Sequence, residues 1–201
     1  MSEKMKIKVI IGSTRPGRFS ERPAQWIFEE LQKETTVEAE LLDLRDFPMP
    51  FFDAVTPPSM AGGVYDNAII TKWAEKIKSA DGYIIVTPEY NHSFPAVLKN
   101  ALDVLGAEWA RKPIGFVSYG GASGVRAVEQ LRLVAGELNM TPIKQALHIP
   151  VDIFMGHMMG TGPQGPEAFV PMRTGQTDYV ANFFTNLLWW AEALNTARSK
   201  N

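Results

Sequence analysis

Cysteine is absent from the 201-residue sequence, which excludes disulfide bridges, zinc sites built on thiolates and a cysteine nucleophile. Long apolar runs are absent as well, and the first eight residues alternate charged with apolar side chains instead of forming the apolar core of a signal peptide. The three histidines lie far apart, without the spacing of metal ligands. We therefore expect a cytoplasmic protein with no membrane contact and no metal site.

Net charge is small too, with a formal value of -2 at pH 7. A chain this close to neutrality has no electrostatic reason to bind nucleic acid or an anionic membrane. Its hydrophobic content of 45% and charged content of 21% are ordinary for a globular protein. The length suits one core, so we expect a single domain over residues 1–201, with a loop and helix extension from about residue 151.

Hydrophobic spacing switches along the chain between the periods of strands and helices. It predicts strands at residues 5–11, 39–44, 82–87, 113–119 and 141–149. It predicts helices at residues 20–31, 69–77, 94–105, 125–138 and 179–197, and the last carries an apolar stripe of Phe183, Leu187, Trp190 and Leu194. Proline, glycine and methionine favour long loops at residues 47–66 and 152–176. Such alternation indicates an α/β fold, a doubly wound parallel sheet of five strands with helices on both faces.

The loop after the first strand has the composition of an anion site. It contains Ser13, Arg15, Arg18 and Ser20 and leads directly into a helix. Backbone N–H groups and the positive end of a helix attract anions, and guanidinium groups match phosphate oxygens. The loop lacks both the Gly-Lys-Ser/Thr of a P-loop and the glycine spacing that admits a pyrophosphate, so it favours a monophosphate. The alternative is a capped helix whose arginines face solvent.

The loop after the third strand places Pro88, Glu89, Tyr90 and Asn91 directly beyond a buried strand. Ligands of open parallel sheets bind beyond the carboxyl ends of the strands, where the winding reverses. Backbone N–H groups of such a segment can border a planar heterocycle. The alternative is a simple turn in which Ser93 caps the next helix.

After the fourth strand, Ser118, Gly120 and Gly121 begin a glycine-rich loop. Glycine allows the backbone to approach a flat ligand closely, although the loop could equally be a flexible connection. The nucleophile elbow of the α/β-hydrolases is not met, because Val125 stands where its second glycine would be needed.

Three segments of the chain resemble the NADPH-dependent FMN reductase family, which includes quinone, chromate and azo-dye reductases. These segments are IIGSTRPGR, TPEYNHSFPAVLKNALD and KPIGFVSYGGASGVRAVEQLR, and the similarity extends over about residues 6–149. The resemblance implies a flavodoxin-like fold with strand order 2-1-3-4-5 and a non-covalent FMN cofactor. It also implies ping-pong hydride transfer from NADPH or NADH to a small acceptor, with the chemistry on the flavin and no catalytic side chain.

The resemblance also suggests a role for each candidate residue. Ser13 and Arg15 would hold the FMN phosphate, and residues 88–91 would border the isoalloxazine. Gly120 and Gly121, which follow Ser118, would approach its pyrimidine side. Much of the family has serine and asparagine where this chain has Arg18 and Ser20, and Arg18 could replace them as a cation.

The leading hypothesis is therefore an NAD(P)H oxidoreductase whose acceptor is a free flavin, a quinone, an azo compound or a metal oxyanion. One alternative is a flavodoxin-like electron carrier, although such carriers tend to be strongly acidic. A hydrolase or sugar-phosphate binder is a further alternative. The aromatic last helix, the long loops and the resemblance together predict a homodimer or homotetramer.

Overall fold

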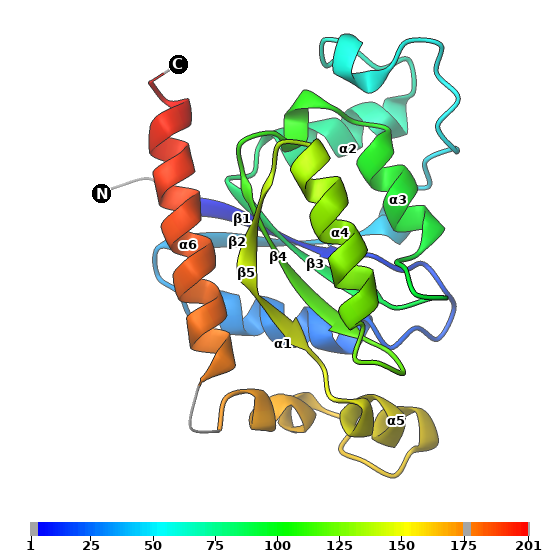
Figure 1. Ribbon diagram of the computed structural model, residues 1–201, viewed down its shortest axis with the longest axis vertical. Helices are drawn as coiled ribbons and strands as arrows, with labels where there is room; N and C mark the ends of the chain where they lie inside the picture. Colours follow the sequence, from blue (N-terminus) through cyan, green and yellow to red (C-terminus); the bar gives the residue numbers. More distant parts are fainter. Residues whose placement is uncertain (1–3, 175–177, 201) are drawn as a thin grey trace.

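The computed structural model describes residues 4–174 and 178–200 (Figure 1). Both ends of the expected domain, residues 1–3 and 201, lie outside the described residues, as does the end of the expected loop at 175–176. Five parallel strands form one sheet in the order β2-β1-β3-β4-β5. The strands are β1 Met5–Ile11, β2 Val37–Asp43, β3 Gly82–Pro88, β4 Pro113–Tyr119 and β5 Thr141–His148. The predicted fold class and strand order are confirmed.

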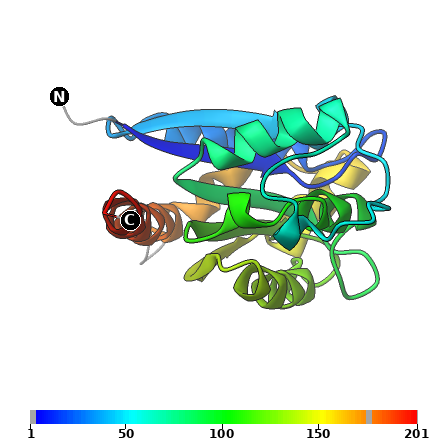
Figure 2. The same ribbon diagram turned by 90° about the horizontal axis from the view of Figure 1, so that it is seen from above.

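Helices cover both faces of this sheet (Figures 1 and 2). They are α1 Glu21–Leu31, α2 Ala68–Lys78, α3 Ala96–Asp103, α4 Val125–Glu137, α5 Val151–Met159 and α6 Tyr179–Arg198. One core cluster joins α1 and α6 to side chains such as Val9 of β1, and a second joins α2, α3 and α4 to side chains such as Ile10. Adjacent strand residues thus face opposite layers, as the pleat requires.

The inner strands have the composition of a sheet covered on both sides. Every residue of β3 and of β4 is buried, including Thr87 and Ser118 near their carboxyl ends. Strands without a solvent face read as continuous apolar runs, which is why these two were the clearest in the sequence. The edge strand β2 is only partly buried and begins at Val37, two residues before its predicted start. The prediction started late because Glu38 is charged, which an edge strand tolerates since this side chain is exposed to solvent.

The structure corrects the prediction of a loop at residues 152–176. This segment contains most of helix α5 and a 3-10 helix, Pro166–Met172. Its methionines are good helix formers, and Gly160 ends α5 in the left-handed conformation with a φ of 66°. Phe154 of α5 packs on Phe19 and Tyr119, with ring centroids 5.3 and 5.4 Å apart, so tertiary contacts support this glycine-interrupted helix.

The other long loop and the last helix agree better with the sequence. Residues 47–66 contain one short 3-10 helix, Pro58–Met60, and a turn closed by the Val64 N–H, which donates to Ala61 O over 3.1 Å. In α6, Phe183 and Leu187 are fully buried as predicted, whereas Trp190 and Leu194 are only partly buried. No helix within the two described ranges is both long and apolar enough to span a membrane.

Glycine at position 115 of β4 allows α6 to pack directly on the sheet. A Cβ atom there would collide with the ring of Phe183, which is fully buried. We expect Gly115→Ala to lower the free energy of unfolding by about 1–3 kcal/mol, because the core must make room. As a control, Gly136→Ala places its Cβ in open space within α4 and should stabilise the protein by about 0.5–1 kcal/mol. Urea unfolding of both variants tests this, and a shift of the same sign in both would contradict it.

Candidate functional site

The loops that follow β1, β3 and β4 contact one another at the carboxyl edge of the sheet. The N–H of Gly12 donates to Val86 O over 2.8 Å, and the N–H of Glu89 donates to Tyr119 O over 2.9 Å. The hydroxyls of Ser13 and Tyr90 lie 3.4 Å apart. The three loops singled out in the sequence therefore form one surface.

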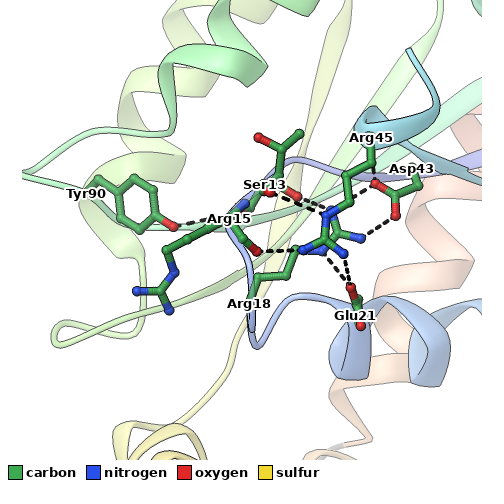
Figure 3. A network of polar contacts seen from close by, with 8 residues as sticks. Ser13, Arg15, Arg18, Glu21, Asp43, Arg45 and Tyr90 are labelled. Atoms are coloured by element: carbon green, nitrogen blue, oxygen red, sulfur yellow. Dashed lines mark hydrogen bonds and ion pairs between the residues drawn. The ribbon is translucent and has the colours of Figure 1, made fainter. Parts of the chain in front are cut away.

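Arg18 fixes the β1–α1 loop from inside. Its side chain is buried and its guanidinium donates to the backbone oxygen of Ser13, to both carboxylate oxygens of Asp43 and to Glu21 (Figure 3). Burial by itself would raise the pKa of Asp43, but hydrogen bonds from Arg18 and from the Arg45 N–H hold that pKa below its ordinary value. A guanidinium with these partners has little left to offer a ligand, so the geometry argues against Arg18 as the phosphate cation.

Arg45 fixes the same loop from the outside and was missed in the sequence. It belongs to the 3-10 helix Leu44–Asp46 after β2. Its guanidinium donates to Thr14 O over 3.3 Å, to Arg15 O over 2.7 Å and to Glu21 over 2.8 Å (Figure 3). The loop and Arg45 are about thirty positions apart in sequence, so no local pattern signals the contact.

Arg15 is different from both. Its side chain is exposed, and its guanidinium makes no hydrogen bond or ion pair with any described residue. Figure 3 shows it pointing away from Asp43 and Glu21, toward the side on which Tyr90 lies. Arg15 is thus a cation of this loop that remains available to a ligand.

The β3–α3 loop is a tight turn anchored by an ion pair. Tyr90 and Ser93 exchange two backbone hydrogen bonds of 2.8 and 3.0 Å, and the residues between them, Asn91 and His92, have φ values of 50° and 69°. Two successive left-handed residues are typical of a two-residue hairpin turn, and asparagine tolerates that conformation well. The turn of that alternative is present, but its cap is wrong, because the cap position of α3 is Pro95 and not Ser93.

Pro88 and Glu89 connect this turn to its neighbours. Pro88 is buried as the last residue of β3, paired with Tyr119 of β4. The Glu89 side chain is only 3% exposed and forms an ion pair with Arg126 at the start of α4. The Arg126 N–H also donates to Glu89 over 3.2 Å, so the turn is tied to the N-terminus of α4.

In the β4–α4 loop, Ser118 holds the backbone. Its Oγ lies 2.8 Å from Ser123 O and 2.8 Å from His148 Nδ1. A hydroxyl has one proton, so we infer that Ser118 donates to Ser123 O and that His148 Nδ1–H donates to Ser118. Burial lowers the pKa of His148, which keeps the ring neutral in that tautomer at neutral pH. Ser118 thus supports the loop from within.

The glycines of this loop differ in how much space surrounds them. Gly124 has a φ of 76°, and a Cβ there would lie 2.5 Å from the Cβ of Ser118. Gly120, with a φ of 145°, lies against Glu89. Gly121 has nothing within 4 Å of its Cβ position, so its backbone is open to an approaching molecule.

Tyr119 was not among the candidate residues, although it ends a central strand. Its ring contacts Phe19 with a centroid distance of 4.9 Å. Burial raises its pKa to about 12, so the hydroxyl remains protonated at neutral pH, and Arg15 and Tyr90 are among the charged and polar groups around it. Its position at the end of β4 was the signal that sequence reasoning could have used.

The β1–α1 loop presents several hydrogen-bond donors that have no regular acceptor among the described residues. The buried hydroxyl of Ser20 lies beside the Tyr119 hydroxyl, but it makes no hydrogen bond of regular geometry within residues 4–174 and 178–200. The N–H groups of Thr14 and Gly17 likewise make no hydrogen bond within those ranges. Together with the unpaired guanidinium of Arg15, they match a phosphate monoester, which offers acceptor oxygens and negative charge. The residues present therefore fit an FMN phosphate.

Comparison with known proteins agrees with this geometry. Residues 5–152 match the family model described as NADPH-dependent FMN reductase. An NAD(P)H-dependent FMN reductase of Schizosaccharomyces pombe is 44% identical over 149 residues, which cover 73% of this chain and 74% of the relative. A quinone reductase of Escherichia coli is 36% identical over 105 residues, 52% of each chain.

The fold has solved counterparts as well. The structure of a flavodoxin from Pseudomonas aeruginosa, a C101A mutant, superposes with a TM-score of 0.54 at 19% identity, covering 91% of this chain and 99% of the other. At that identity the likeness concerns the fold alone. The family match spans the three loops and the whole five-stranded sheet, and we conclude that the chain belongs to the NADPH-dependent FMN reductase family, as an FMN enzyme that oxidises NAD(P)H.

Proposed function

We propose that the carboxyl edge of the sheet holds FMN and that the bound flavin passes electrons from NAD(P)H to a quinone. The observation that carries this proposal is the Arg15 guanidinium, which pairs with no described residue and lies on the loop whose Thr14 and Gly17 N–H groups also have no acceptor among the described residues. A cation left free among paired arginines is typical of a site completed by an anion. The flavodoxin-like fold favours the same edge.

The phosphate lies on the β1–α1 loop in this proposal. Arg15 supplies the charge, Ser20 and the Thr14 N–H supply donors, and Ser13 shapes the loop through its contact with the Arg15 N–H. Arg18, which sequence reasoning included, is assigned to holding the loop because Asp43 and Glu21 occupy its guanidinium.

The ring system lies between the other two loops. The turn at residues 88–91 borders one side of the isoalloxazine in this proposal, and the loop at Gly120 and Gly121 faces its pyrimidine edge, where Gly121 has open space and Gly120 lies against Glu89. Glu89 and Ser118 are held in ion-pair and hydrogen-bond contacts, so they position these loops without touching the flavin. The hydroxyls of Tyr90 and Tyr119 lie on the same surface and can donate hydrogen bonds.

The chemistry that FMN supplies is two-electron transfer, in which hydride is taken from NAD(P)H and delivered to a second substrate. Both substrates must reach the same ring among three loops, so they occupy one place in turn. This supports a ping-pong reaction, in which the oxidised nicotinamide leaves before the acceptor binds. The relative named as a quinone reductase supports a quinone as the acceptor.

Steady-state kinetics of the purified protein test this reaction directly. NADPH oxidation measured at several fixed concentrations of a soluble benzoquinone should give parallel double-reciprocal lines. Intersecting lines would contradict the ping-pong order. A protein that stays colourless after incubation with FMN and oxidises no NADPH would contradict the proposal as a whole and favour a phosphate-binding hydrolase.

Arg15→Ala tests the phosphate contact. Loss of one charge-assisted hydrogen bond costs about 1.5–3 kcal/mol, which corresponds to roughly tenfold to a hundredfold weaker FMN binding. Riboflavin lacks the phosphate, so its affinity should not change. Melting of the apo-protein should shift little, because Arg15 makes no core contact. Fluorescence titration with both flavins provides the measurement, and equal losses for the two would refute the role of Arg15.

We also propose that the chain acts as one domain and assembles as a homodimer or homotetramer. Large apolar side chains are exposed in the loop at residues 47–66, where Phe51 is 77%, Met60 75% and Val64 75% exposed. Trp189 on α6 is 62% exposed. Side chains of this kind gain free energy when an interface covers them. Light scattering at micromolar concentration should give a multiple of the 22.3 kDa chain mass, and an active monomer would disprove it.

A further inference from the structure

Two arginines bind three consecutive carbonyl groups of the β1–α1 loop. Arg18 donates to the oxygen of Ser13, and Arg45 donates to those of Thr14 and Arg15 over 3.3 and 2.7 Å. We call these contacts the carbonyl clamp. The two arginines come from different elements, since Arg18 precedes α1 and Arg45 follows β2.

The carbonyl clamp determines where the N–H groups of the loop point. Every peptide bond here is trans, and a trans peptide is planar with its oxygen and hydrogen on opposite sides. The peptide whose oxygen meets Arg18 therefore turns the Thr14 N–H away from the clamp. The peptide after Thr14, whose oxygen meets Arg45, carries the Arg15 N–H, which donates to Ser13 Oγ over 3.4 Å. The peptide after Arg15 precedes Pro16 and has no N–H, so at this peptide Arg45 fixes the backbone of Arg15. Figure 3 shows the Arg15 side chain and Tyr90 on this opposite side of the loop.

The charges of the clamp are balanced locally. Asp43 and Glu21 accept hydrogen bonds from the two guanidiniums, so two positive and two negative groups lie together on one side of the loop. The carbonyl clamp therefore orients the loop without adding net charge to it, and Arg15, which pairs with no described residue, lies on the other side. Preorganised donors bind an anion more tightly than donors that must be ordered on binding.

We propose that Arg45 is a positioning residue for the cofactor phosphate, which it does not touch. It holds the carbonyl oxygens of Thr14 and Arg15, which fixes the backbone of Arg15 and thereby the side of the loop on which the Arg15 guanidinium meets the phosphate. This inference rests on the proposed FMN site. Arg45 is suited to a test because its side chain is 37% exposed, whereas that of Arg18 is 1% exposed and inseparable from folding.

The experiment compares FMN and riboflavin affinities for wild type, Arg45→Met, Arg45→Lys and Arg22→Met. Methionine keeps the length without donors, and lysine keeps the charge but loses the planar fork that reaches two carbonyls and Glu21. Arg22 is an exposed arginine at the start of α1 that takes no part in the carbonyl clamp, so Arg22→Met controls for the loss of one charge. The ratio of the two affinities is taken within each variant, which removes any effect of a partly folded sample.

We expect Arg45→Met to weaken FMN binding about tenfold while riboflavin binding stays within about twofold of wild type. Arg45→Lys should lose most of the same preference, and Arg22→Met should keep it. The positioning role would be overturned if Arg45→Met bound FMN as tightly as wild type, or if it lost FMN and riboflavin affinity equally. It would also be overturned if Arg45→Lys kept the preference for FMN while Arg22→Met lost it, because the charge alone would then matter. Equal binding of FMN and riboflavin by wild type would instead show that the phosphate site itself is wrong.

Discussion

The parallel pairing of β1, β3 and β4 is the constraint on which this site depends. Ile11 pairs with Val86, and Pro88 pairs with Tyr119, so the three strands end at nearly the same level. Each strand then passes into its loop at one edge, where backbone groups no longer have ladder partners. Hydrogen-bonding groups from segments far apart in sequence are thereby gathered on one surface.

Each of the three loops is held by a polar contact to a neighbouring element. The β1–α1 loop is held by Arg18 and Arg45, the β3–α3 turn by the ion pair of Glu89 with Arg126, and the β4–α4 loop by Ser118. Charges of this kind are costly to bury unless their partners are also in place. These contacts give loops without regular structure the rigidity that a cofactor site needs.

Helix α5 adds a further layer at this edge. Phe154 packs against Phe19 of the first loop and Tyr119 of the fourth strand, and His157 also lies 5.1 Å from Phe19 between ring centroids. The residues after β5 are thus part of the wall that supports the first loop. Sequence reasoning treated them as a loop because glycine and proline surround a short helix whose stability comes from these aromatic contacts.

The sequence by itself determined the strands and the loops that follow them, because continuous apolar runs such as β3 and glycine-rich loop openings are local signals, whereas the strand order followed from the family resemblance. The three segments that resemble the family were identifiable for the same reason, since each is a continuous stretch of sequence. Only the tertiary structure decided which arginine is free. Arg15 and Arg18 look equivalent in the sequence, yet Asp43, 25 positions away from Arg18, pairs with one and leaves the other exposed. Contacts between distant positions depend on how the strands align, and no local periodicity encodes that alignment.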